Sequence, residues 1–260
     1  MNYKNEVIML KKTLLDADKL LSKIELKTVV VYSSQNNNCC ISCHTDDDLA
    51  YVFVKSNEDG YTEKEFSLRS WNSMHSILGS FCNPETVDDL KLKFGYDSET
   101  YPNTIEFKNG RLKLTHFLQN YSLLRNQQEL LADYTKKKLA LNQFSGDGDY
   151  IDDGVVKDIS RMSGLVNEKL FRINYKESIG TYVYFGDENQ SADNGSIVID
   201  ENESSVLYKN DVYFPVDYFV NIYKALSGDG FKMKLYGDKI IMINNGDITS
   251  KVAIIRGKHQ

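Results

Sequence analysis

The sequence lacks the features that mark exported and membrane-spanning proteins. Its 260 residues include no run of about 18 apolar residues, the length needed to cross a bilayer. The first six residues, Met-Asn-Tyr-Lys-Asn-Glu, do not form the apolar centre of a signal peptide. We therefore expect the protein to stay where it is made. We expect that place to be the cytoplasm of a bacterium or a phage-infected host, or the nucleus if the source is eukaryotic or viral.

Recognisable catalytic motifs are also missing. The chain has four histidines, and none stands in a nucleophile or metal-ligand motif. No glycine-rich loop of the kind that holds phosphate is present. We expect no enzymatic activity, no cofactor and no resident metal.

Cysteine is scarce, with four residues in the chain, and we expect free thiols because disulfide frameworks belong to small exported domains. Cys40-Ile-Ser-Cys43-His44 has the spacing of a haem attachment site, and Cys39 beside it raises the alternative of zinc. Alternate residues of a strand face opposite ways, so these side chains do not converge on one ion. The favoured interpretation is a half-buried strand with small thiols.

Two acidic segments have a metal-binding and a structural interpretation. Residues 46–48, Asp-Asp-Asp, are typical of a cation site or of a polar turn, and the behaviour of Asp in turns favours the turn. Residues 146–153 resemble a calcium loop without its final glutamate, so we interpret them as a turn between a strand and a helix.

Composition excludes another class of protein. The net charge of −6 rules out a generally basic surface that holds nucleic acid by bulk attraction, so any DNA contact has to be local. Hydrophobic residues make up 41% and charged residues 26%, as in ordinary folded domains. The length accommodates two domains of about 110 to 130 residues.

What the chain does contain is an internal repeat. Residues 66–78 align with residues 214–226, and the match continues from 90–94 to 231–235 and from 105–110 to 241–246. The offset falls from 148 to 141 to 136 in polar stretches, where loops absorb changes of length. In the first stretch the aligned pairs are Phe66 with Phe214, Trp71 with Phe219, Met74 with Ile222 and Leu78 with Leu226. The chain is therefore interpreted as one domain written twice.

Strands are predicted by runs rich in β-branched and aromatic residues at 29–32, 51–54, 170–175, 181–185 and 196–199. The Asn-Gly pairs at 109–110 and 245–246 predict tight hairpins, since Asn and Gly accept positive φ angles. Helical spacing predicts four helices, at residues 11–24, 70–81 and 153–166 and from an Asp217 N-cap to a Gly228 stop.

The apolar face of each helix is expected to be buried. Its members are Leu14, Ala17, Leu21 and Ile24; Trp71, Met74, Ile77, Leu78 and Phe81; Val155, Ile159, Met162 and Val166; and Phe219, Ile222, Tyr223 and Leu226. Trp71 is interpreted as a core residue and not as a platform for stacking a base.

Residues 119–138 have no counterpart in the repeat. Four leucines near helical spacing are consistent with a short amphipathic helix, whereas a tandem repeat calls for an extended connector to the next strand, at 139–144. We favour the connector. The predicted organisation is domain 1 at 1–118, the connector at 119–138 and domain 2 at 139–260.

This organisation resembles that of the DNA sliding clamps, specifically the two-domain type of the T-even phages and of proliferating cell nuclear antigen. The sharpest pieces are residues 65–78, 105–114 and 239–255, within an order of strand, helix, three strands, helix and three strands. The resemblance implies an α+β DNA-clamp fold, with two helices of each domain lining the inner face of a ring. It implies a processivity factor that encircles duplex DNA without sequence preference.

The charge pattern agrees with such a ring in sign. Over the predicted helices, basic residues exceed acidic residues by four, against −6 for the whole chain. Exposed cations on a helix are by default only solvated charges, but the excess of basic residues recurs in three of the four helices. In a clamp, such residues contact the DNA backbone. The expected DNA-binding residues are Lys11, Lys12, Lys19, Lys23, Arg69, Lys157, Arg161 and Lys224.

The resemblance also implies protein partners. Six domains in a ring imply a homotrimer, and the expected subunit interface comprises Arg111, Leu112, Leu114, Phe117, Val198 and Val206. DNA polymerase and the clamp loader are expected to dock short hydrophobic peptides at Leu123, Leu124, Ile254 and Ile255. Two alternatives stay open: a clamp-like factor that does not close into a ring, and a duplicated β-rich structural or virion protein.

Overall fold

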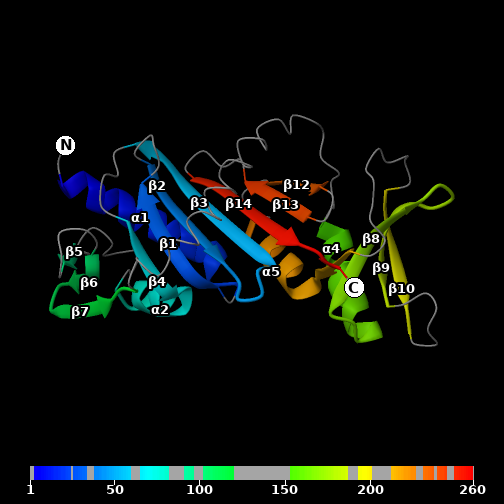
Figure 1. Ribbon diagram of the computed structural model, residues 1–260, viewed down its shortest axis with the longest axis horizontal. Helices are drawn as coiled ribbons and strands as arrows, with labels where there is room; N and C mark the ends of the chain where they lie inside the picture. The colour runs from blue at the N-terminus through cyan, green and yellow to red at the C-terminus, as the bar shows by residue number, and fades with distance from the viewer. Residues whose placement is uncertain are drawn as a thin grey trace. The chain divides into compact units, whose positions relative to one another are not determined.

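The chain divides into two compact units. The computed structural model describes residues 3–24, 26–33, 38–59, 65–81, 91–96, 102–119, 153–186, 193–200, 212–226, 231–236, 239–244 and 249–259 (Figure 1). Unit 1 contains residues 1–46, 52–146 and 246–251, and unit 2 contains residues 47–51, 147–245 and 252–260. None of the described helices combines the length and the apolar character that crossing a membrane requires.

Unit 1 combines two helices with two antiparallel strand groups. One group has the order β3-β2-β1-β4 and the other β5-β6-β7. Its elements are α1 (Tyr3–Leu21), β1 (Lys27–Ser33), β2 (Asn38–His44), β3 (Ala50–Asp59), β4 (Phe66–Ser70), α2 (Trp71–Phe81), β5 (Lys91–Tyr96), β6 (Pro102–Asn109) and β7 (Leu112–Phe117).

Unit 2 has the same plan. One strand group has the order β10-β9-β8-β11-β15 and the other β12-β13-β14. Its elements are α4 (Asp153–Val166), β8 (Leu170–Lys176), β9 (Gly180–Phe185), β10 (Gly195–Asp200), β11 (Val212–Pro215), α5 (Val216–Leu226), β12 (Phe231–Tyr236), β13 (Lys239–Asn244), β14 (Thr249–Arg256) and β15 (Lys258–His259). The first three residues of β14, 249–251, fall in unit 1. The architecture is therefore α+β with antiparallel sheets.

The two units repeat both the order of elements and the strand pairing. β1 pairs antiparallel with β2 and β4, and β8 pairs antiparallel with β9 and β11. The second helix of each unit also begins in the same way. The Trp71 amide donates to the Leu26 carbonyl at 3.4 Å, and the Val216 amide donates to the Lys169 carbonyl at 3.0 Å. Trp71 therefore corresponds to Val216.

This correspondence corrects the alignment made from the sequence, which pairs Trp71 with Phe219. The structural equivalence differs by three residues, close to one helical turn. Apolar residues on a buried helix face recur every three or four positions, so a shift of three leaves the pattern intact. Val216, Phe219 and Tyr223 are all buried, and the sequence pattern alone does not distinguish the two registers.

The buried faces of the helices follow the prediction closely in three of the four. α2 buries the five predicted residues, from Trp71 to Phe81. α4 instead buries Val156 and Ile159, while Val155, Met162 and Val166 are half-buried. The Met162 sulfur lies 2.5 Å from the point where a Cβ of Gly195 would stand. The missing side chain at Gly195 thus lets α4 approach β10 closely.

Several predicted boundaries are corrected. α1 begins at Tyr3 and not at residue 11, because Val7 and Leu10 continue the spacing of Leu14, and no strand precedes it among the described residues. α5 begins at Val216, one residue before the expected cap. The β6–β7 turn consists of Gly110 and Arg111, with Gly110 at a φ of 56°. The connector at 119–138 beyond Gln119, the strand at 139–144, the turn at 245–246 and residues 146–152 lie outside the described residues.

The cysteine strand β2 is buried on both faces and not only on one. Cys39, Cys40 and Cys43 are buried free thiols, and burial raises the pKa of Cys39 and of Cys43 well above the usual value. Within the described ranges, no three His, Cys, Asp or Glu side chains gather in a way that holds a metal ion. At residues 46–48 the predicted turn is confirmed: Asp48 has a φ of 56°, and the Leu49 amide donates to Asp47 Oδ1 at 3.2 Å.

Candidate nucleic-acid interface

The first helix presents cations to solvent on the side opposite its buried face. Leu14 and Ala17 are fully buried, whereas Lys12 and Lys19 are exposed on the same helix. Lys23 follows the helix end and is exposed as well. The side chains of all three lysines are therefore exposed to solvent.

Lys11 lies in a different environment. Its exposed fraction is 5%, so its ammonium group is not presented to solvent. Although the sequence places Lys11 with the DNA-binding lysines, it is left out of the proposed phosphate-contacting set.

The acidic residues of α1 are used within unit 1. Asp16 Oδ1 lies 3.1 Å from the ammonium nitrogen of Lys251, which is 2% exposed. Asp18 accepts a hydrogen bond from the Trp71 indole at 2.7 Å, and its other oxygen lies 2.9 Å from His75 Nδ1. Both carboxylates are thus engaged inside the unit, whereas Lys12 and Lys19 of the same helix are exposed.

The second helix of unit 1 has no charged residue. Its exposed face consists of Asn72, Ser73, His75, Ser76 and Ser80. Small polar side chains of this kind let a duplex approach closely but add little attraction. Arg69, which precedes this helix, has a side chain outside the described residues.

In unit 2 the exposed cations on the helices have exposed acids on the same helices. Lys157 and Arg161 are exposed on α4, together with Asp158. Lys224 is exposed near the end of α5, where a cation also interacts favourably with the helix dipole. The Tyr223 hydroxyl donates to Asp153 of α4, which joins the two helices.

The observed helix bounds reduce the predicted charge excess. The four described helices contain seven basic and six acidic residues, an excess of one where the predicted bounds gave four. Lys23 falls outside α1, while Lys4, Glu6, Asp153 and Asp217 fall inside helices. Among exposed side chains the excess of basic over acidic residues is larger than this count, because Asp16 and Asp18 are turned into unit 1.

Such a surface binds phosphate without reading bases. Lysine and arginine side chains on flexible stems neutralise backbone phosphates, and this interaction carries no sequence information.

Each unit also ends in an open strand edge with exposed apolar side chains. β7 pairs with β6 and β10 pairs with β9, and within the described part of the chain no strand pairs with the other edge of either. Phe117 on β7 is 78% exposed and Val198 on β10 is 44% exposed. Leu112, Leu114 and Arg111 are exposed beside Phe117, and Val206 lies outside the described residues.

Sequence reasoning did not single out Leu165. This residue of α4 is 65% exposed and lies one turn after the Met162 that packs on β10. The helical spacing places Leu165 on the polar side of α4. An apolar residue on a polar helix face is the sequence signal that could have identified it. Two of the sequence-predicted partner residues, Ile254 and Ile255, are buried in β14 and do not lie at the surface. The other two, Leu123 and Leu124, lie outside the described residues.

Comparison with known proteins gives likenesses to solved structures but no match in sequence. No family model matches the chain, and no curated protein matches it. The crystal structure of proliferating cellular nuclear antigen from Entamoeba histolytica is similar to this chain, with 10% sequence identity, a TM-score of 0.48, and coverage of 97% of this chain and 96% of that one. This similarity is too weak to support a conclusion about function. Any functional conclusion has to rest on the residues of this chain.

Proposed function

We propose that the protein is a sliding clamp: a ring that encircles duplex DNA and tethers a DNA polymerase without catalysing a reaction. The chain supplies two units with one plan, and three copies supply six. In this proposal the helices face the duplex and the strand edges join neighbouring subunits.

The observation that carries the proposal is the pair of open apolar strand edges. An exposed strand edge invites pairing with another chain, and soluble proteins normally cover it or place charges on it. β7 exposes Leu112, Leu114 and Phe117 as well as the charged Lys113, and β10 exposes Val198. Pairing β7 of one copy with β10 of the next buries both edges, and such a head-to-tail contact closes into a ring when the rotation fits.

The exposed helix cations support the DNA part of the proposal. Lys12, Lys19, Lys23, Lys157, Arg161 and Lys224 are all exposed. Loose contacts between these side chains and phosphates hold a duplex while allowing it to slide. Arg69 is kept in the proposal, although its side chain lies outside the described residues.

A tether also needs a site for the polymerase and the clamp loader. We keep the proposal that each docks a short hydrophobic peptide near the connector, at Leu123 and Leu124. Ile254 and Ile255 are buried, so in this conformation they do not contact a peptide from solvent. A pull-down with the C-terminal peptide of the co-encoded polymerase tests this docking, and its failure leaves the ring untouched.

Light scattering of the purified protein tests the ring. A homotrimer has three times the 29.8 kDa mass of the chain. The trimer is expected to stay on closed circular DNA and to slide off the same DNA after it is cut. A monomer or dimer that still increases polymerase processivity supports the non-ring clamp. Assembly without any retention on circular DNA supports the structural protein and overturns the clamp.

A further inference from the structure

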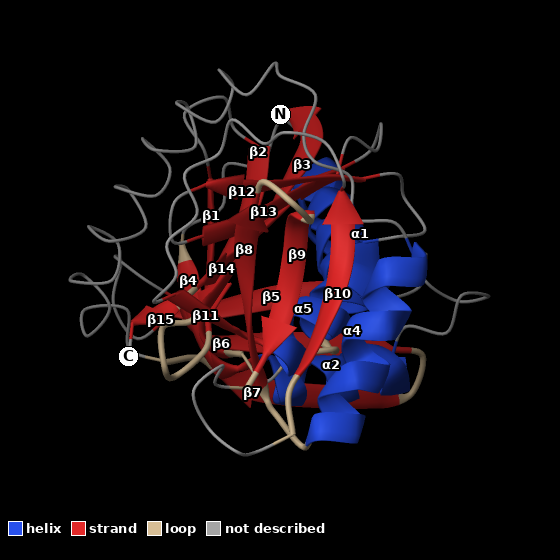
Figure 2. Ribbon diagram, turned by 90° about the vertical axis from the view of Figure 1, so that its right-hand side faces the viewer, coloured by secondary structure: helices blue, strands red, loops and turns tan. Residues whose placement is uncertain are grey.

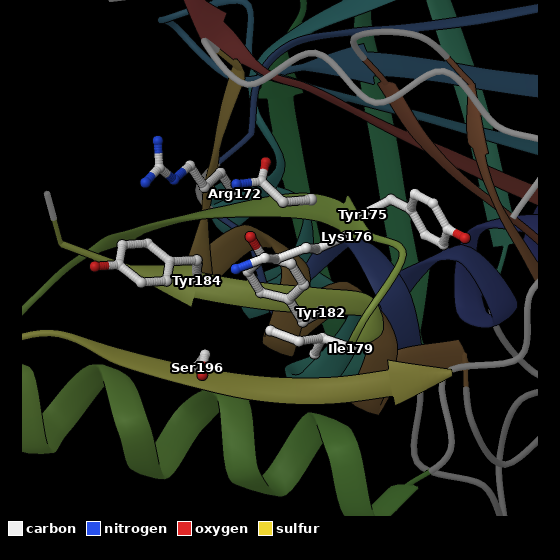
Figure 3. Close-up of a pocket in the computed structure, with 8 residues that line it drawn as sticks. Arg172, Tyr175, Lys176, Ile179, Tyr182, Tyr184 and Ser196 are labelled. Carbon is white, nitrogen blue, oxygen red and sulfur yellow. The ribbon is translucent and has the colours of Figure 1, made fainter. Parts of the chain in front are cut away.

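A hollow in unit 2 plays no part in the proposed clamp. It has a volume of about 460 Å³ and lies over β8, β9 and β10 (Figure 3). β8, β9 and β10 lie side by side, with α4 packed against β9 and β10 (Figure 2). A side chain at Gly195 would point at Met162 of α4, so this face of β10 is the one that packs against the helix. Successive residues of a strand face opposite ways. Ser196, which lines the hollow, is therefore on the face away from the helix, and we call this site the outer-face hollow.

Two cations stand at the outer-face hollow. The guanidinium carbon of Arg172 lies 4.7 Å from the centre of the Tyr184 ring and 5.8 Å from that of Tyr213. This stacking holds the guanidinium in place at the wall of the hollow. Lys176 lies on the same strand and the same face, and it is exposed. None of the described residues that line the hollow is acidic, so its charge matches an anionic ligand.

The side-chain amide of Asn174 at the same site limits which anionic ligands fit. Asn174 lies between Arg172 and Lys176 on the same face of β8 and is 5% exposed. Among the described residues, no hydrogen-bond donor reaches its side-chain oxygen. Buried polar atoms are almost always hydrogen-bonded, so this oxygen calls for a donor from a ligand. A free carboxylate is an acceptor only and does not meet this need, whereas a ligand that carries an N–H group beside its anionic group does.

A peptide with acidic side chains has both features. Its backbone N–H groups donate to Asn174, and its carboxylates bind Arg172 and Lys176 through charge-assisted hydrogen bonds. The rings of Tyr182 and Tyr184 provide apolar surface for its remaining side chains (Figure 3).

We propose that the outer-face hollow binds a short acidic peptide segment of a partner protein. The site lies within unit 2 and does not depend on ring closure. It adds to the chain a second docking surface whose chemistry differs from that of the hydrophobic peptide motif.

Peptide selection tests this site and does not require the partner protein to be identified. A random 12-residue library is displayed on phage and selected on the intact protein, and the enriched peptides are synthesised with a fluorescent label. Their affinities are then measured by fluorescence anisotropy. We expect the selected peptides to be rich in Asp and Glu. We expect Arg172→Glu and Lys176→Glu to weaken binding about tenfold or more, since each reverses a charge-assisted contact.

Matched variants and a spectroscopic signal place the peptide in the hollow. Lys169→Glu makes the same charge change at an exposed lysine outside the lining and is expected to leave affinity unchanged. Asn174→Leu is expected to weaken binding, and the side-chain amide signal of Asn174 is expected to shift when the peptide is titrated. Thermal unfolding of each variant checks its folding. Should Arg172→Glu fail to fold, the exposed Lys176→Glu carries the test.

Three outcomes overturn the proposal. The first is a set of selected peptides with no acidic bias, and the second is equal binding by Lys176→Glu and Lys169→Glu. In the third, a DNA duplex displaces the peptides and shifts the same Asn174 signal, which assigns the hollow to nucleic acid. Because the protein used is the intact chain at any oligomeric state, these outcomes leave the clamp proposal standing.

Discussion

Lys251 is a lysine whose charge is held inside unit 1. Its ammonium nitrogen lies 3.1 Å from Asp16 Oδ1, and its side chain is 2% exposed against 22% for Asp16. Removing the partner of a buried charge costs more than removing the charge, because the remaining ion stays desolvated. We expect Asp16→Asn to lower the free energy of unfolding by about 2 to 3 kcal/mol, less than for a fully buried pair because Asp16 is partly solvated. Urea unfolding at neutral pH measures this loss.

The same carboxylate provides the control. Lys19 pairs with Asp16 at 3.7 Å, but its side chain is 71% exposed. Exposed pairs contribute little, so Lys19→Ala is expected to change the unfolding free energy by no more than about 0.5 kcal/mol. Similar losses for Asp16→Asn and Lys19→Ala would show that the buried pair does not stabilise the fold.

His116 on β7 makes stability depend on pH. Burial lowers its pKa below the ordinary value of 6.5, so the folded chain binds its proton less readily than the unfolded chain. This contribution is complete above pH 6.5 and is lost as the pH falls toward the folded pKa. We expect the urea midpoint to fall as the pH is lowered from about 7 through the ordinary histidine range, and His116→Asn to flatten that fall.

The pH range of this measurement separates His116 from the nearby acid. Glu106 on β6 has a pKa below its ordinary value of 4.5, mainly because Lys113 donates a hydrogen bond to it, so its contribution is lost only in stronger acid. If the urea midpoint of His116→Asn falls with pH as steeply as that of the original chain, the assignment to His116 is wrong.

At the scale of elements, the open edges β7 and β10 decide assembly. Phe117 is 78% exposed, so Phe117→Asp is expected to leave the thermal midpoint nearly unchanged. In the proposed ring the same aspartate is buried without a partner, and the mass in light scattering is expected to fall to that of one chain. Lys108→Asp, on the neighbouring strand β6, is the control and is expected to retain the assembled mass. An unchanged mass for Phe117→Asp excludes β7 as the joining edge.

The sequence predicts elements best where one face is unambiguous. α2 has apolar residues only at the positions that it buries, so its face follows from spacing. α4 also has apolar residues beside its buried stripe, and the face that is buried depends on the close approach of Met162 to Gly195. The predicted start of α1 is wrong because the resemblance implies a strand there, although Val7 and Leu10 already have helical spacing.

Features that depend on distant parts of the chain are not predictable from local patterns. The burial of Lys11 and the pairing of Lys251 with Asp16 follow from tertiary packing, which spacing does not encode. The repeat is visible in the sequence, but its predicted register is three residues off because a helix pattern nearly repeats after one turn. The outer-face hollow needs the alignment of β8 with β9 and β10, which only strand pairing fixes.

For the whole molecule, the central physical question is how a chain with a net charge of −6 holds an anionic duplex. General attraction has the wrong sign, so the exposed helix cations have to act at short range. The double variant Lys12→Glu with Lys157→Glu is expected to shorten retention on circular DNA while leaving the assembled mass unchanged. It is also expected to reduce the salt dependence of retention, by about one unit of slope for each lost phosphate contact.

The control for this variant separates local contact from net charge. Lys258→Glu with Lys169→Glu makes the same total change at exposed lysines outside the helices, on β15 and before β8. If phosphates meet the helices, only the first pair shortens retention, because charges beyond about 10 Å are screened at ordinary salt. Equal shortening by both pairs means that net charge alone governs the interaction, and the helices then do not face the duplex.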